Sequence, residues 1–147
     1  MKKLRIGFSP CPNDTFIFDA LIHGKIDTEG LCFEMYMADV EELNKMALLG
    51  DLDITKLSYH AYLHMLETYT MMDAGSALGN NCGPLLIKNT GDKHPTIDDL
   101  IAIPGKYTTA NFLLNFAFPE LHNKKEILFS EIELALKNKE VTAGLII

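Results

Sequence analysis

The chain has 147 residues, of which 48% are hydrophobic and 22% are charged, and its formal net charge is −7. This balance is typical of a globular protein that buries a sizeable core. The negative charge argues against a nucleic-acid partner, because phosphate binding needs a basic surface. No apolar run approaches the roughly 18 residues of a membrane span, and the apolar stretch in residues 1–8 is too short for a signal peptide. We therefore expect a cytoplasmic protein with no membrane partner.

The first half of the chain alternates short apolar strands with amphipathic helices. Helix starts are indicated by capping residues, and helix ends by glycines. Asp39 with Glu42 three residues later forms the capping-box pattern. The expected elements are a strand at 4–9, a helix capped by Asn13 or Asp14 and ended by Gly24, a strand at 31–37, a helix from Asp39 to Gly50, a strand at 54–58, and a helix at 59–66.

The second half repeats this alternation after a less regular stretch. Residues 71–72 could form a short strand, and the glycine-rich residues 75–83 indicate a turn. The polar, turn-rich residues 89–95 predict a boundary between a first lobe, 1–88, and a second lobe, 89–147. The expected elements are strands at 84–88, 101–103 and 127–129, a helix at 109–118, a helix capped by Ser130 and reaching 138, and a buried parallel strand at 141–147.

Alternating strands and helices joined by short turns predict α/β architecture, in which parallel sheets are covered by helices on both faces. Ligands of such folds gather at the carboxyl ends of the strands. The last strand reaches Ile147 without a cap, a turn or a polar tail. We therefore expect a truncated chain whose second lobe is incomplete.

Residues 101–111 form the most informative stretch, a short strand that runs into a glycine- and hydroxyl-rich turn before a helix. Such a turn directs backbone N–H groups, the hydroxyls of Thr108 and Thr109, and the positive end of a helix dipole toward one place. This arrangement suits a small anionic ligand. An ordinary capped loop has the same pattern, so both interpretations stay open.

A second candidate site is the proline-stiffened turn at residues 9–16, where Ser9, Asn13 and Asp14 are possible cleft residues near a helix N-terminus. Cys11 could be a nucleophile there, but no histidine nearby in the sequence could act as its base. We interpret Cys11 as a structural or bystander thiol.

A third candidate is the predicted strand at 54–58, whose alternation would put Lys56 and Ser58 on the same side. A lysine near the end of a buried strand is unusual unless its charge is paired or bound. We therefore expect Lys56 to meet a substrate carboxylate, the alternative being a solvated surface lysine.

No metal site is expected. The chain has an odd number of cysteines at irregular spacing, which fits neither a disulfide framework nor a zinc pattern. His60 and His64 have a spacing that can place two imidazoles on one metal, but no third ligand accompanies them. We interpret them as an exposed or hydrogen-bonded pair.

Four stretches, 9–16, 55–58, 79–84 and 103–111, together resemble the 1,4-dihydroxy-6-naphthoate synthase family of the futalosine route to menaquinone. The resemblance implies a two-lobed, periplasmic-binding-protein-like (type II) fold. It also implies a carbon–carbon lyase that splits cyclic dehypoxanthinyl futalosine, a small-molecule carboxylate, into 1,4-dihydroxy-6-naphthoate and a sugar-derived fragment. No cofactor is implied.

The resemblance further implies which residues bind substrate, namely Lys56, Leu57 and Ser58 in the first lobe, with Thr109 and Ala110 in the second. The family's proton-accepting histidine would directly follow Ile147. We thus expect no catalytic residue within the chain and an inactive fragment of the enzyme.

Two alternative functions stay open. A solute-binding protein for a small carboxylate would share the fold, but would need a signal peptide or lipid anchor. The related chorismate dehydratases also share the fold, but lack the Ser-Pro-Cys-Pro-Asn-Asp turn at residues 9–14.

Overall fold

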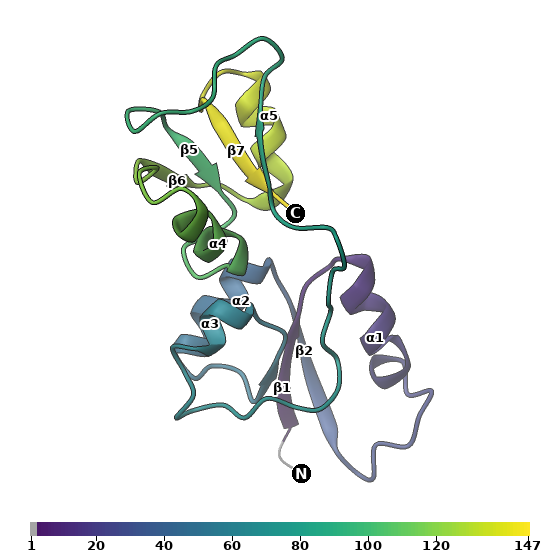
Figure 1. Cartoon of the computed structure of the whole chain (residues 1–147). Coiled ribbons are helices and arrows are strands. Elements are labelled where there is room, and N and C mark those ends of the chain that lie inside the picture. Colours follow the sequence, from purple (N-terminus) through teal and green to yellow (C-terminus); the bar gives the residue numbers. More distant parts are fainter. Residues whose placement is uncertain (1–2) are drawn as a thin grey trace. The chain divides into compact units, whose positions relative to one another are not determined.

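The chain folds into two compact units, Met1–Leu78 and Gly79–Ile147 (Figure 1). This computed structural model describes residues 3–147. Met1 and Lys2, which begin the stretch that is too short for a signal peptide, lie outside the described residues. Both units combine a small sheet with helices. The expected α/β class, with parallel and mixed sheets flanked by helices, is confirmed.

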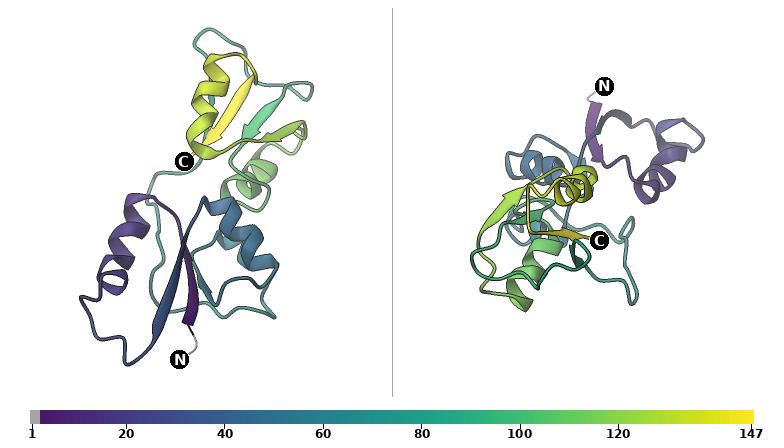
Figure 2. Two further views of the ribbon diagram at one scale, coloured as in Figure 1. Left: turned by 180° about the vertical axis from the view of Figure 1, so that it is seen from behind. Right: turned by 90° about the horizontal axis from the view of Figure 1, so that it is seen from above.

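The first unit has an all-parallel sheet in which β1 (Lys3–Phe8) lies between β2 (Cys32–Met37) and β3 (Ile54–Thr55). Helix α1 (Pro12–Ile22) lies on one side of this sheet and α2 (Val40–Leu48) on the other, as Figures 1 and 2 show. The short helix α3 (Tyr59–Tyr62) follows β3. Apolar side chains fill the core because they alternate on the strands and recur at helical spacing on α2.

A close approach of the backbone explains the glycine in the central strand. A Cβ atom on Gly7 would lie 2.6 Å from Leu52 Cδ1 and 2.8 Å from Leu43 Cδ2. Leu43 is fully buried and Leu52 is 3% exposed. Glycine therefore lets α2 and the segment before β3 pack directly on the middle of the sheet.

Several elements of the first unit differ from the sequence predictions. Helix α1 is capped at Cys11, not at Asn13 or Asp14, and Pro12 occupies its first turn, where a missing N–H costs nothing. The strand predicted at 54–58 is β3, which ends at Thr55. The helix predicted to reach residue 66 ends at Tyr62 and continues as turns, and residues 71–72 form no strand.

The second unit has a mixed sheet in the order β4-β7-β5-β6. Strand β5 (Ile101–Ile103) pairs in parallel with β6 (Lys124–Glu126) and β7 (Ala143–Ile146), whereas β4 (Leu85–Lys88) is antiparallel to β7. Its helices are α4 (Thr109–Ala117), α5 (Ile132–Lys137) and a 3₁₀ turn at Phe129–Glu131.

Alternation along β5 divides the core of this unit into two layers. Ile101 and Ile103 pack with the α4 residue Leu114, whereas Ala102 packs with Ile132 and its neighbours on α5. The two helices therefore cover opposite faces of the sheet, as Figure 2 shows. All three β5 residues are buried, which explains why this strand is apolar throughout.

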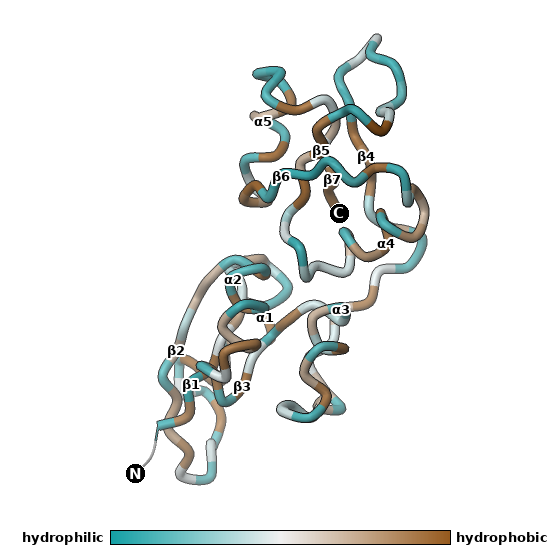
Figure 3. Tube along the Cα trace, turned by 90° about the vertical axis from the view of Figure 1, so that its left-hand side faces the viewer, coloured by the Kyte–Doolittle hydropathy of each residue, from teal (hydrophilic) through white to brown (hydrophobic). Residues whose placement is uncertain are grey.

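The edge of this sheet is where the second unit differs most from the sequence prediction. The strand expected at 127–129 is instead the polar segment β6, which appears hydrophilic in Figure 3. An edge strand pairs on one side only, so charged side chains are tolerated and discourage aggregation. The following helix is capped at Glu131, not at Ser130.

Along the chain, the first unit ends at Leu78 and the second begins at Gly79. The lobe boundary expected from the sequence lies later, between residues 88 and 89. The reason is that β4 pairs with β7. The antiparallel ladder assigns residues 85–88 to the second unit, and a long-range pairing of this kind leaves no local mark in the sequence.

Candidate functional site

The turn after β1 is organised by a buried carboxylate. Asp14, in the first turn of α1, reaches back and accepts hydrogen bonds from Ser9 N at 3.0 Å and from Ser9 Oγ at 2.8 Å. Ser9 is 3% exposed and Asp14 is 5% exposed. An acid in the first turn also interacts favourably with the helix dipole. Asp14 thus fixes the turn that the two prolines stiffen.

The second oxygen of Asp14 binds Lys56, which follows β3. Lys56 Nζ lies 2.8 Å from Asp14 Oδ1, and the Lys56 side chain is 21% exposed. Because β1 and β3 are parallel neighbours, their following loops emerge at the same edge of the sheet. In the sequence these residues belong to separate candidate sites, and the structure joins them in one ion pair.

Ser58 is held by a different helix. Asn44 of α2 donates from Nδ2 to Ser58 Oγ at 3.2 Å and accepts from Ser58 N at 2.9 Å. The ladder ends at Thr55, so strand alternation does not govern the residues beyond it. The expectation that Lys56 and Ser58 share one side is therefore wrong: Lys56 reaches α1, whereas Ser58 reaches α2.

This arrangement has the connectivity of a topological switch point. The chain leaves β1 toward α1, and it leaves β3 toward the α2 side of the sheet. Adjacent parallel strands whose connections diverge in this way leave a crevice at their carboxyl ends, the usual ligand site of open α/β sheets. We define Ser9, Asp14, Lys56 and Ser58 as the switch-point cluster. Leu57, between Lys56 and Ser58 in the sequence, is half-buried, and Asn13 is exposed.

The turn before α4 is the corresponding feature of the second unit. Thr108 caps the helix by accepting from Asn111 N at 3.3 Å, and its hydroxyl donates to Gly105 O at 2.8 Å. Thr109 and Ala110 are the first two helical residues, whose N–H groups point out of a helix start. Capping by Thr108 confirms that residues 105–108 form a capped loop, and the site role of Thr109 and Ala110 stays a prediction.

Asn111 and Lys124 support this turn from behind. Asn111 Nδ2 donates to Lys106 O at 2.9 Å, and Lys124 Nζ donates to Asn111 Oδ1 at 3.0 Å. Lys124 also binds Asn115 Oδ1. Partial burial lowers the pKa of the Lys124 ammonium below its usual value of 10.5. These contacts connect the start of α4 to the Lys106 carbonyl and to Lys124 of β6.

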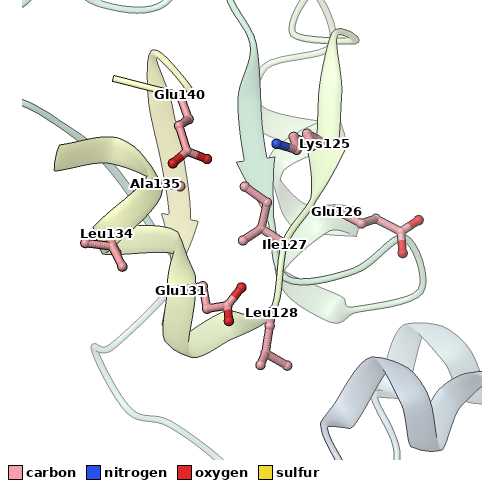
Figure 4. A pocket seen from close by; sticks show the side chains of 8 residues that line it. All are labelled: Lys125, Glu126, Ile127, Leu128, Glu131, Leu134, Ala135 and Glu140. Carbon is pink, nitrogen blue, oxygen red and sulfur yellow. The ribbon is translucent and has the colours of Figure 1, made fainter. Parts of the chain in front are cut away.

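Other hollows and clusters do not coincide with the predicted site residues. A hollow of about 470 Å³ lies between β6 and α5, and Figure 4 shows Glu131 and Glu140 among its side chains. With Glu126 also lining it, its acidic character disfavours a carboxylate ligand. His60 Nε2 lies 3.4 Å from His64 Nε2. Within residues 3–147, no group of three or more metal-binding side chains could hold an ion, and no helix has the length and hydropathy to cross a membrane.

Sequence reasoning missed Asn44, Glu41 and Asn111, which are buried polar residues near the candidate sites. Asn44 had a detectable signal, because it stands beside Leu43 on the buried face of a helix where an apolar residue is expected. The contacts of Asn44 with Ser58 and of Asn111 with Lys124 join different elements and depend on tertiary packing.

Comparison with known proteins decides the family. Residues 4–147 match the family model described as menaquinone biosynthesis. The chain belongs to the menaquinone biosynthesis family. Its relatives in this family include two proteins named 1,4-dihydroxy-6-naphtoate synthase: one of Thermus thermophilus, 43% identical over 147 residues, and one of Streptomyces coelicolor, 36% identical over 153 residues. The chain spans 53% and 52% of their lengths, about half in each case.

Solved structures confirm the periplasmic-binding-protein-like fold. A crystal structure of an Archaeoglobus fulgidus protein matches 99% of the chain and 53% of its own length with a TM-score of 0.88 and 36% identity. The ligand-binding component of an ABC-type import system from Staphylococcus aureus has a TM-score of 0.62 at 17% identity. The periplasmic aliphatic sulphonate binding protein of Escherichia coli has a TM-score of 0.57 at 11% identity. Each of these two matches includes 99% of the chain and 54% of the other protein's chain. Their likeness concerns the fold alone.

Proposed function

We propose that the protein to which this chain belongs is a 1,4-dihydroxy-6-naphthoate synthase, a cytoplasmic carbon–carbon lyase that converts cyclic dehypoxanthinyl futalosine to the naphthoate. The observation that carries the proposal is the 43% identity to the T. thermophilus synthase across all 147 residues. The family assignment to menaquinone biosynthesis is consistent with this activity.

The switch-point cluster would bind the substrate carboxylate in the first unit. A lysine ammonium has three N–H donors, and Asp14 accepts one from Lys56. The others can donate to a carboxylate while Asp14 keeps the side chain in place. Since Asp14 offsets the charge of Lys56, recognition would depend on directed hydrogen bonds from Lys56 and Ser58 more than on net charge. Leu57 would contribute apolar contact.

The start of α4 would supply a second anion-binding element. Backbone N–H groups of Thr109 and Ala110, at the positive end of the helix dipole, suit a ligand oxygen. The turn is fixed in advance by Thr108 and Asn111, so little conformational entropy would be lost on binding. In the proposed enzyme, these residues of the chain would contribute substrate binding.

The experiment compares two polypeptides with the same substrate. One is the 147-residue chain, and the other is the chain fused to the part of the T. thermophilus relative that it does not match. We expect the fusion to release 1,4-dihydroxy-6-naphthoate, detected by chromatography with mass spectrometry. Lys56→Met should weaken binding in both polypeptides, whereas the exposed Lys137→Met should not.

A solute-binding role is the second candidate, because two fold neighbours are named as binding proteins. Saturable binding with intact substrate recovered from the fusion would favour that role. No binding by either polypeptide would contradict both candidates.

A further inference from the structure

Asn44 is the most unusual residue near the switch-point cluster. Its side chain is fully buried, and it lies on α2 beside Leu43, whose side chain is in the core. A buried amide in this place is costly unless all of its hydrogen-bonding groups are satisfied. The residue does not cap its own helix, which is capped by Asp39.

The hydrogen bonds of Asn44 account for every polar atom of the amide. Oδ1 accepts from Ser58 N at 2.9 Å, and Nδ2 donates to Glu41 Oε2 at 3.0 Å and to Ser58 Oγ at 3.2 Å. A backbone N–H can only donate, so the oxygen of the amide must face Ser58 N. The orientation of the amide follows from this contact, and Nδ2 must face Glu41 and the Ser58 hydroxyl.

The direction of these bonds sets the role of the Ser58 hydroxyl. A serine hydroxyl has one hydrogen and two lone pairs. Because Asn44 Nδ2 has only hydrogens to offer, Ser58 Oγ is the acceptor in this contact and keeps its own hydrogen for another partner. The hydroxyl makes no capping bond to the first turn of α3, and Ser58 is only half-buried.

We propose that Asn44 is a positioning residue that fixes the Ser58 hydroxyl as a hydrogen-bond donor to a ligand carboxylate at the carboxyl end of β3. The inference rests on the proposed function for the nature of that ligand. Asn44 acts through Ser58 and does not itself touch the ligand. Glu41 completes the arrangement by accepting the second hydrogen of Nδ2, so that the amide cannot rotate without losing three bonds.

A paired exchange tests the direction of the bond. The double variant Glu41→Gln with Asn44→Asp preserves net charge, and its glutamine amide can donate to the new aspartate. The aspartate still accepts from Ser58 N but has no hydrogen to donate, so the Ser58 hydroxyl turns and donates to it instead. The proton direction at Ser58 is then reversed with the same residue sizes.

Binding of 1,4-dihydroxy-6-naphthoate to the 147-residue chain is measured through the fluorescence of the naphthalene ring. Ser58→Ala should weaken binding about 10-fold or more, as expected for a lost hydrogen bond to a charged group. The exchange should weaken binding by a similar factor. Adding Ser58→Ala to the exchange should then cost nothing further, because the hydroxyl no longer serves the ligand. Glu42→Gln, on the exposed side of α2, is the matched control and should bind as the unaltered chain does.

The cycle separates proton direction from two other effects. If the shifted negative charge alone weakened binding, Ser58→Ala would cost the same factor in both backgrounds, and the proposal would be wrong. Equal far-UV circular dichroism and melting temperature in the exchange and the unaltered chain identify a folded protein. Should the exchange unfold, Asn44→Ala provides the second cycle with Ser58→Ala, and full additivity there would also overturn the proposal. No binding by the unaltered chain would contradict the proposed function and this inference with it, whereas unchanged binding by the exchange would contradict the inference alone.

Discussion

Replacing Asp14 by alanine should destabilise the first unit more than any surface change. The substitution leaves Lys56 without its carboxylate, and it leaves Ser9 N, in a residue that is 3% exposed, without its acceptor. Breaking a buried ion pair from one side costs roughly 3–5 kcal/mol. The Lys56 side chain is 21% exposed and can turn partly toward water, so we expect the lower end of that range, about 3 kcal/mol.

Urea unfolding measured by tyrosine fluorescence is the appropriate assay. Four of the five tyrosines, Tyr36, Tyr59, Tyr62 and Tyr69, lie in the first unit, so the signal mainly reports this unit. The control is Asp19→Ala on the same helix, where the carboxylate pairs with Lys25 at the surface. We expect little change there, because water and salt screen exposed pairs.

A second variant identifies the unpaired charge as the cause. Asp14→Ala combined with Lys56→Met should recover part of the lost free energy of unfolding, because no uncompensated ammonium remains. If Asp14→Ala unfolds at the same urea concentration as Asp19→Ala, the buried ion pair does not stabilise the unit and the reasoning is refuted. If the combined variant is less stable than Asp14→Ala alone, the loss does not come from the charge of Lys56.

Three further predictions concern single positions. Gly144→Ala should destabilise the second unit by about 1–3 kcal/mol, because its Cβ would lie 2.5 Å from Ile132 Cγ2. The assay is urea unfolding followed by circular dichroism, and Gly83→Ala, where the added Cβ meets open space, is the control. Equal urea midpoints for the two variants would contradict the prediction. Burial raises the pKa of Tyr69 above its usual 10.0, so the unfolded chain releases that proton at lower pH than the folded chain does. The stability of the unaltered chain relative to Tyr69→Phe should therefore fall as pH rises above 10.0. Melting temperatures of the two proteins that fall in parallel with increasing pH would refute this. Thr108→Ala should cost about 1 kcal/mol through loss of the α4 cap, measured by urea unfolding of the second unit, and no loss would show that the cap is replaceable.

Most of the helices and strands, and their order along the chain, follow from local sequence patterns, although the strand predicted at 127–129 lies at Lys124–Glu126 and residues 71–72 form none. Apolar runs at 101–103 and 141–147 predict buried strands, because burial on both faces excludes polar side chains. The structure has these strands at Ile101–Ile103 and Ala143–Ile146. Asp39 at the start of α2 and the threonine before α4 mark helix starts through local hydrogen bonds. The family resemblance could also be read from the chain, because its motifs are contiguous in the sequence, and the family model confirms it.

Which polar residues come together depends on how distant segments of the chain pack. Asp14 and Lys56 are 42 positions apart and meet because β1 and β3 are parallel neighbours. Asn44 reaches Ser58 because α2 packs against the same sheet from the other side. The polar segment β6 forms a strand because it pairs at the edge of the sheet, where charged side chains are tolerated. Each of these outcomes depends on contacts between distant segments, and neither spacing nor propensity within one segment contains that information.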